Sequence, residues 1–248
     1  MIKLNKGMWA SLTLVATISA AAPAHAETPP IAAGFRVGTL GIGAEGTIGV
    51  NDYINVRVPF NLFSYSDSRN EDGIDYDGKL KLQSFGAQVD VHPFKGSFFL
   101  SAGLFANGNK LKLHASDPTG EEEYDIGDAT YVSDTSDPLD LNARMKFNSV
   151  APYAGLGWGN PILGDRNLYF RLEIGAYFQG AGKIDMKATG SAKNQDDDSA
   201  SFKVDGDTPE AMLFQANLEQ ERSDLEGDIK DFKIYPAISL AIGYRFKL

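Results

Sequence analysis

Hydrophobic and polar residues alternate along this chain, and the alternation is most regular near its C-terminus. From residue 234 to residue 246, every second position is apolar or aromatic, and the positions between them are small or polar. A β-strand points successive side chains to opposite faces, so this segment is predicted to be a strand with one apolar face. Because a strand in a soluble core can show the same pattern, its recurrence elsewhere in the chain decides its meaning.

The same alternation recurs in seven earlier segments, which are predicted to be strands. They span residues 40–50, 54–62, 85–91, 98–106, 150–158, 168–178 and 183–189, the last with the weakest alternation. Residues 79–82 carry their apolar side chains in the opposite phase to residues 85–91. Since an extra residue shifts the phase of a strand, a β-bulge is expected near Gln83 and Ser84.

Aromatic residues mark both ends of four of these strands. The pairs, nine to eleven residues apart, are Tyr53 and Phe63, Phe85 and Phe94, Phe147 and Trp158, and Tyr235 and Tyr244. A tilted strand needs about 9–11 residues to cross hydrocarbon, and aromatic rings gather at both membrane interfaces. Aromatic residues favour strands in general, but their repetition in four strands favours a membrane-spanning β-barrel.

The N-terminus has the pattern of an export signal. Lys3 and Lys6 precede an apolar stretch over residues 9–20, and Ala24-His25-Ala26 forms a cleavage site. Residues 1–26 are therefore predicted to be a signal peptide, and residues 27–248 to be a barrel domain. The chain has no cysteine, which excludes a lipoprotein anchor and disulfide crosslinks. No later segment is a continuous apolar run, which excludes an α-helical membrane protein.

The mature chain is acidic. Without Lys3 and Lys6 it keeps 21 of its 23 basic residues against 33 acidic ones, a formal charge of −12. Nucleic acid is therefore excluded as a partner, because phosphate binding of that kind needs a concentrated basic surface.

Connections between the predicted strands are unequal. Those at 51–53, 92–96 and 159–166 are short, whereas those at 64–78, at 114–142 and after residue 190 are long and acidic. One of the long connections contains a helix start at Asp207, Thr208 and Pro209. An apolar stripe at helical spacing extends the helix to residue 232, and we expect it to pack against the barrel rim or partly plug its mouth.

The pattern thus predicts an all-β fold: an antiparallel transmembrane β-barrel of eight strands, with one amphipathic helix before the last strand. Bacterial single-chain barrels have even strand numbers, and segment 183–189 is needed to reach eight. The helix then joins the last two strands on the short-turn rim, and both chain ends lie on the long-loop rim. Loop lengths and chain ends disagree about which rim faces outside, so the orientation stays open.

The signal ending at Ala26, the repeated amphipathic strands and the closing segment from Tyr235 to Phe246 resemble the small outer-membrane β-barrel proteins of Gram-negative bacteria. This resemblance implies cleavage after Ala26, localisation in the outer membrane and contact with its lipid and lipopolysaccharide. It also implies recognition by the barrel-assembly machinery through Tyr244 and Phe246. Such proteins usually end in an aromatic residue, whereas here Lys247 and Leu248 follow Phe246.

Six charged residues occupy positions predicted to face the barrel interior. They are Glu45, Arg57, Asp90, Arg171, Glu173 and Arg245. The interior of an eight-stranded barrel is just wide enough for side chains to fill it, and charges confined there must pair. We expect a structural ion network that fills the barrel. The alternative is a charged constriction in a narrow channel.

Residues for catalysis or metal binding are few. Only His92 and His114 remain after signal removal, and His92 precedes a proline in a short turn, where it is expected to cap or face solvent. Ser116 and Asp117 are close to His114 in sequence, but triads assemble from separate segments. The acidic runs 121–123 and 196–198 lack the ligand spacing of a calcium loop. No catalytic residue, metal site or cofactor is predicted.

The sequence therefore favours a non-enzymatic envelope protein, structural or surface-interacting, with a side-chain-filled interior. A narrow outer-membrane channel or transporter is the first alternative, and an outer-membrane enzyme acting on lipid A is the second. A soluble periplasmic ligand-binding barrel is the alternative architecture, but it would bury charged residues such as Glu45 and Arg57 around its ligand.

Overall fold

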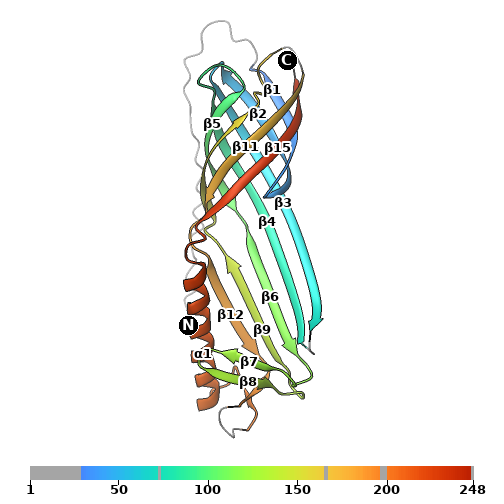
Figure 1. The fold of residues 1–248 in the computed structure, drawn as a ribbon, viewed down its shortest axis with the longest axis vertical. Helices are drawn as coiled ribbons and strands as arrows, with labels where there is room; N and C mark the ends of the chain where they lie inside the picture. The colour runs from blue at the N-terminus through green and yellow to red at the C-terminus, as the bar shows by residue number, and fades with distance from the viewer. Residues whose placement is uncertain (1–28, 72–73, 165–166, 196–199, 247–248) are drawn as a thin grey trace, which may run out of the picture.

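The computed structural model describes residues 29–71, 74–164, 167–195 and 200–246. Within them, eight antiparallel strands close into a barrel at one end of an elongated molecule (Figure 1). The ring consists of β1 (Ile31–Gly38), β2 (Gly41–Asn51), β3 (Ile54–Glu71), β4 (Ile74–Val91), β5 (Phe98–Asn107), β10 (Val150–Trp158), β11 (Leu168–Phe178) and β15 (Ile234–Phe246). Pairing of β1 with β15 and of β4 with β5 completes the closure. The predicted signal peptide and the terminal residues 247–248 lie outside the described residues.

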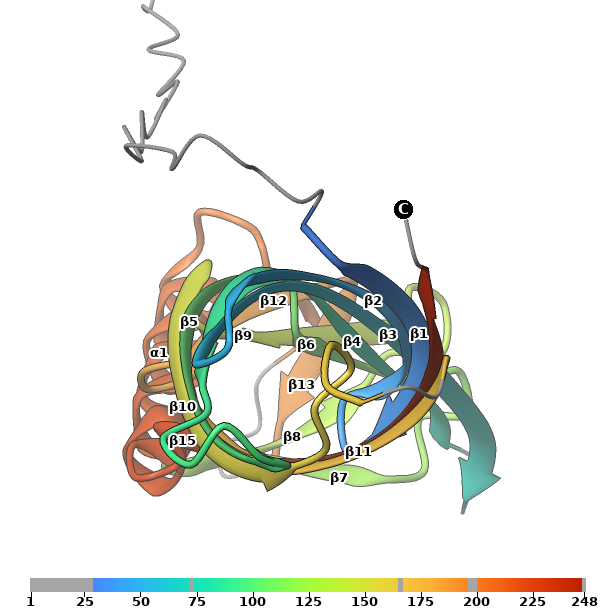
Figure 2. The ribbon, with the colours of Figure 1, turned by 90° about the horizontal axis from the view of Figure 1, so that it is seen from above.

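Beyond the barrel, β3 and β4 continue into a second structure, which we call the extension. The far half of β4 pairs with β6 (Lys110–Asp117), which pairs with β9 (Leu139–Lys146), and β9 pairs with β12 (Lys183–Thr189). A small sheet closes its end, formed by β7 (Glu123–Ile126), β8 (Ala129–Ser133), β13 (Ser191–Asn194) and β14 (Phe202–Lys203). Viewed along the barrel, helix α1 (Pro209–Ile229) lies outside the ring (Figure 2).

The barrel has eight strands as predicted, but the prediction that segment 183–189 is one of them is wrong. That segment is β12, whose alternation arises because one face of the extension is apolar. The eighth barrel strand is β1, which the pattern does not predict. Its inward positions are mostly alanine and glycine, and one of its outward positions is alanine as well, so the contrast between its faces is small.

This exchange of strands also corrects the predicted arrangement of the rims. Cα pairing of Ile31 with Phe246 places both ends of the barrel at one rim, and the connections 51–53, 92–97 and 159–167 lie there too. The β3–β4 hairpin and the long excursions after β5 and β11 lie at the opposite rim. The chain ends therefore share a rim with these three short connections, whereas the tight β1–β2 turn and α1 belong to the side of the long connections.

The predicted bulge in β4 is also wrong. The Cα register between β3 and β4 keeps one offset from Ile54 opposite Val91 to Glu71 opposite Ile74. Instead, the two faces of β4 exchange character: Phe85 points outward and Ser84 inward, whereas beyond Gln83 the buried residue is Leu82. The phase of the apolar positions changes because the surroundings of the strand change.

Helix α1 begins as predicted and packs elsewhere than predicted. Thr208 caps it, because its hydroxyl accepts a hydrogen bond from the Ala211 amide at 3.2 Å. Phe214 and Leu218 are buried in the core of the extension, where the helix contacts β12, β7 and β14. The helix thus neither packs on the barrel rim nor plugs it. Within the described residues, no helix is both long and apolar enough to cross a bilayer.

Candidate functional site

The barrel interior brings together five of the six charged residues predicted to face it. Glu45 comes from β2, Arg57 from β3, Asp90 from β4, and Arg171 and Glu173 from β11. All five residues are buried, with at most 4% of their surface exposed. Each occupies an inward position of its strand, between outward apolar neighbours, which is what the alternation predicts.

Arg57 lies at the centre of this cluster. Its Nε and Nη2 donate to the two oxygens of Asp90 at 2.9 and 2.8 Å. Its Nη1 and Nη2 donate to the two oxygens of Glu173 at 2.6 and 2.9 Å. The guanidinium therefore forms bidentate pairs with two carboxylates, the arrangement in which arginine binds carboxylates most strongly.

Two further arginines complete the cluster. Arg171 donates to Glu45 and lies 3.5 Å from Asp90. Arg36 lies 3.6 Å from Glu45 and 3.7 Å from Glu173, and donates to the Ser239 hydroxyl at 2.8 Å. Three arginines thus face three carboxylates, so the interior carries no net charge in this layer.

Arg36 is missing from the sequence prediction because it belongs to β1. The sequence did contain a signal for Arg36, because it lies between two apolar residues, Phe35 and Val37, that point outward. In contrast, the structure does not bring Arg245 into the cluster. Arg245 lies at the short-turn rim, where its Nη1 donates to the carbonyl oxygen of Ile162 at 2.8 Å.

An aromatic layer fills the barrel on the extension side of the ion cluster. The rings of Phe105, Tyr153 and Tyr177 pack with centroids 4.6–5.6 Å apart. The Tyr153 hydroxyl donates to Glu173 at 2.7 Å, which joins the two layers. Gly155 and Gly175 make room for this ring, because a Cβ atom on either would lie within 2.4 Å of the Tyr153 oxygen.

A polar layer occupies the other end of the barrel, at the short-turn rim. His92 is 1% exposed, and its Nδ1 donates to the carbonyl oxygen of Gly96 at 3.0 Å. Its Nε2 then accepts from the Asn55 amide at 3.0 Å, and Asn55 also donates to Asn160. His92 therefore holds the turn after β4, the capping role expected from the sequence, although it is buried there.

The remaining candidate residues lie in the extension. His114 is on β6, with its Nδ1 atom 3.3 Å from Asp140 on β9. The acidic run 121–123 precedes and begins β7, whereas the run 196–198 lies outside the described residues. In the described part of the chain, no group of three or more His, Asp or Glu side chains is arranged to hold a metal ion.

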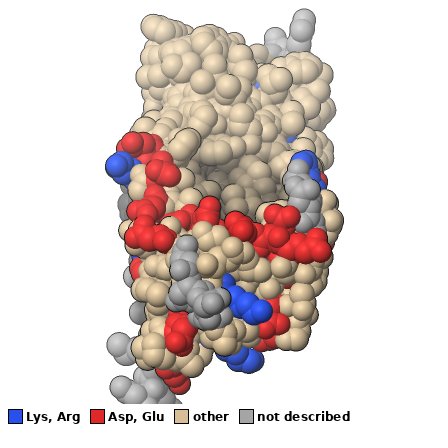
Figure 3. Space-filling model, turned by 60° about the horizontal axis from the view of Figure 1, so that its bottom comes forward, with Lys and Arg blue, Asp and Glu red and all other residues tan. Residues whose placement is uncertain are grey.

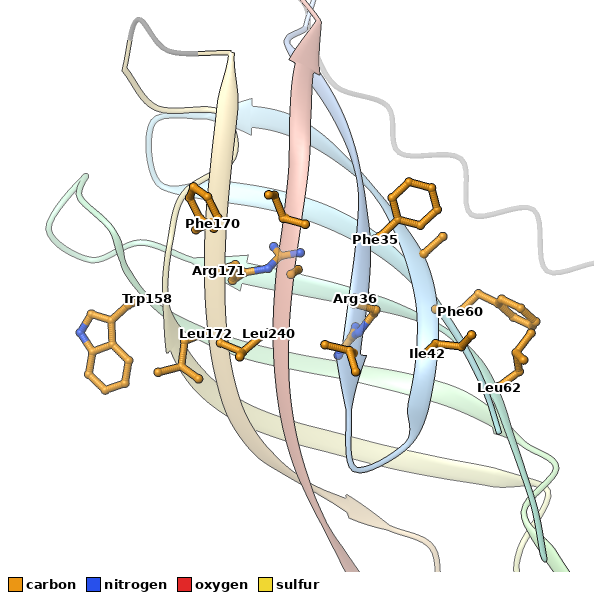
Figure 4. A pocket seen from close by; sticks show the side chains of 15 residues that line it. Phe35, Arg36, Ile42, Phe60, Leu62, Trp158, Phe170, Arg171, Leu172 and Leu240 are labelled. Carbon is orange, nitrogen blue, oxygen red and sulfur yellow. The ribbon is translucent and has the colours of Figure 1, made fainter. Parts of the chain in front are cut away.

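The outer wall of the barrel is apolar. Phe35, Ile42, Phe170 and Leu240 are between 57% and 77% exposed, although they are large hydrophobic residues. They line a shallow outer hollow across β1, β2, β11 and β15, as Figure 4 shows. Monomeric soluble proteins rarely leave a continuous apolar surface of this extent in contact with water.

Comparison with known proteins supports this architecture. No family model matches the chain, and no curated protein matches it by sequence. The crystal structure of Acinetobacter baumannii CarO matches with a TM-score of 0.52 and 19% identity, covering 88% of this chain and 98% of CarO. Acinetobacter baumannii CarO2 matches with a TM-score of 0.53 and 20% identity, covering 89% of this chain and all of CarO2. This similarity in structure confirms the predicted fold, an antiparallel eight-stranded β-barrel.

Proposed function

We propose that the chain is an integral outer-membrane protein whose barrel is a closed anchor and whose extension is a surface module. The main support for a closed barrel is its filled interior, where Arg57, Phe105 and Tyr177 are 0%, 1% and 3% exposed. They belong to layers that adjoin along the barrel axis and are joined by the bond from Tyr153 to Glu173. A solute would have to displace both layers to pass.

The energy of the ion cluster supports closure. Separating a buried arginine from its carboxylates leaves uncompensated charges, at about 3–5 kcal/mol for one broken pair. Arg57 alone makes two such bidentate pairs. Thermal motion therefore does not open this layer, and a conducting state would need a rearrangement of several strands.

The apolar outer wall supports insertion into a bilayer, and the rims support one orientation. Barrels of this kind have short periplasmic turns and longer extracellular parts. The short-turn rim would then face the periplasm and the extension would face the outside. Seen from the extension end, Asp and Glu gather around a hollow with few Lys or Arg (Figure 3), a surface suited to solvent.

The same proposal includes the partners that the sequence resemblance implies. Outward residues of the barrel would contact outer-membrane lipid and lipopolysaccharide. Tyr244 and Phe246 are 47% and 43% exposed at the end of β15, so their rings are accessible to the barrel-assembly machinery. No step of the proposed function is catalytic, and the lipid A mass profile of cells is expected to be the same with and without the gene.

Conductance in planar bilayers tests closure. The purified wild-type protein is expected to give no discrete current steps. A Tyr153→Ala, Tyr177→Ala variant, which removes two rings of the aromatic layer, serves as a comparison for a loosened interior. Reproducible single-channel steps from the wild type would refute the closed anchor and support the narrow channel.

Cysteine labelling tests location, because the chain has no cysteine of its own. Asp128→Cys places a thiol on the exposed β7–β8 turn, and Asp52→Cys places one on the exposed β2–β3 turn. A membrane-impermeant maleimide on intact cells is expected to label the first and not the second. Labelling of Asp52→Cys alone would reverse the orientation, and labelling of neither would contradict surface display.

A further inference from the structure

Four lysines stand in line across four neighbouring strands just beyond the barrel. Lys81 on β4 is opposite Lys110 on β6, which is opposite Lys146 on β9, which is opposite Lys183 on β12. Residues directly opposite each other in antiparallel strands point to the same face. We call these four residues the lysine row.

The lysine row has a basic neighbour on the same face. Two residues further along each strand, the aligned residues are Lys79, Lys112, Arg144 and Asp185. Lysine and arginine thus fill seven of eight positions in two adjacent rows of a protein whose overall charge is strongly negative. Every one of these seven cations is exposed or half-buried.

Few acidic side chains neutralise this face. Among the described residues, Lys146 pairs with Asp185 at 2.8 Å, and no other member of the two rows has an ion pair within 4 Å. Like charges directly opposite each other destabilise a sheet. The fold itself therefore gains nothing from the lysine row, whereas a bound anion would relieve its repulsion.

The position of the row points to the source of that anion. The register of β4 is unbroken, so Lys81 lies on the same side of the strand as the outward-facing Phe85. Four residues of strand span about 13 Å, or about 10 Å along the membrane normal at a tilt of about 40°. Headgroups extend about 5–8 Å beyond the hydrocarbon, and a lysine side chain can bend back to reach them.

The same face is hollowed. Lys112, Arg144, Lys146 and Lys183 line a groove that continues to the flank of α1. On that flank Glu219 and Glu226 both pair with Arg222, at 2.5 and 2.9 Å, which leaves one net negative charge near the seven cations of the two rows. The groove is therefore a basic hollow next to the apolar wall.

We propose that the lysine row binds the phosphate groups of lipopolysaccharide in the outer leaflet. This inference rests on the proposed location of the extension outside the membrane. The lipid is favoured over a soluble anion because the row adjoins the lipid-facing wall and lies on its side of the strand. Binding would fix the extension against the membrane surface.

Stabilisation by lipid tests the proposal. The full chain, refolded in detergent micelles, is titrated with lipid A carrying two phosphates, with the same lipid lacking phosphates, and with inorganic phosphate. Binding to the folded state raises the unfolding midpoint by mass action. The row variant is Lys81→Gln, Lys110→Gln, Lys146→Gln, Lys183→Gln. The control variant removes four exposed lysines elsewhere: Lys193→Gln, Lys203→Gln, Lys230→Gln, Lys233→Gln.

Phosphorylated lipid A is expected to stabilise the wild type and the control variant, and to bind the row variant at least about tenfold more weakly. Without lipid, the row variant should unfold at the same or a higher denaturant concentration than the wild type, because opposed lysines are gone. If four glutamines prevent folding, the pair Lys81→Gln, Lys110→Gln should show the loss, and replacement of the row by arginine should keep the binding.

Equal affinity of the wild type and the row variant for phosphorylated lipid A would overturn the proposal. Equal affinity for the lipid with and without phosphates would overturn it as well. Displacement of the lipid by millimolar inorganic phosphate would make the row a site for soluble anions. If the row fails these tests while Asp128→Cys is labelled on cells, the surface module stands and only its lipid contact is rejected.

Discussion

Leu240→Arg tests whether hydrocarbon covers the barrel. Leu240 is the middle of the outward residues of β15, is 57% exposed, and has Val37 and Leu172 as its cross-strand partners. An arginine on the lipid face costs about 2–4 kcal/mol at the bilayer midplane. On a surface in water, the same exposed position would tolerate the change within about 0.5 kcal/mol.

Leu113→Arg is the matched control. Leu113 is 50% exposed on β6 of the extension, so it differs from Leu240 mainly in what surrounds it. We expect it to change the free energy of unfolding by about 0.5 kcal/mol or less. The contrast between the two variants therefore reports the solvent and not the size or charge of the new side chain.

Denaturant unfolding from lipid vesicles measures both variants. Trp158 is the only tryptophan after residue 26 and is 48% exposed on the outer wall, so its fluorescence reports loss of the membrane environment. A loss of about 2–4 kcal/mol for Leu240→Arg, with Leu113→Arg unchanged, is the expected result. Similar small changes in both variants would refute the lipid-facing assignment of β15.

Three other predictions concern the interior and the extension. Arg57→Met leaves Asp90 and Glu173 buried without their central cation, and we expect a loss of about 3–5 kcal/mol in the vesicle assay; an unchanged stability would contradict the buried network. Phe214→Ala empties a fully buried site between α1 and the small sheet. It should cost the extension about 3–5 kcal/mol, seen as faster proteolysis, while the barrel keeps its heat-modifiable migration. Burial raises the pKa of Asp117, but hydrogen bonds from Thr119 and from the Gly120 amide outweigh it and hold the pKa below its ordinary value of 3.8. The ionised Asp117 carboxylate therefore stabilises the fold above pH 3.8, and this stabilisation is lost as the pH falls through the lowered pKa. Amide hydrogen exchange at β6 should accordingly become faster in acid in the wild type. The Asp117→Asn variant should show no such acid-dependent increase.

Alternation along the chain predicts the barrel well because it reports the faces of strands directly. It fails at β1, where Ala32 and Gly34 face inward and leave little contrast with the outward residues. It also assigns β12 to the barrel, because Ile184 and Met186 alternate with charged residues in the same way. Period two shows that a strand has two unlike faces, but it does not say which other strand lies beside it.

The interior cluster follows from the same logic. Glu45, Arg57 and Glu173 are predictable because each stands alone among apolar and small neighbours on a clear strand. Arg36 can be predicted only if β1 is recognised as a barrel strand. To predict that Arg245 lies away from the cluster, the height of each residue along the barrel axis must be known. Sequence alone gives the face of a residue, whereas height depends on the stagger between strands, which only the pairing register supplies.

The outward face of β4 changes from apolar to charged residues along the strand, and the charges supply information that the period of the apolar residues does not. Outward positions 85, 87, 89 and 91 are apolar or alanine, and outward positions 75, 77, 79 and 81 are all charged. The register of β4 is unbroken, so alternate side chains point to the same face along its whole length. What changes along the strand is whether that face carries apolar or charged residues. A bulge would produce the same shift of apolar phase, but it would not by itself require charges at the vacated positions. Four consecutive outward charges therefore favour a change of surroundings over a break in pairing, and in the proposed bilayer the membrane boundary would lie near Gln83.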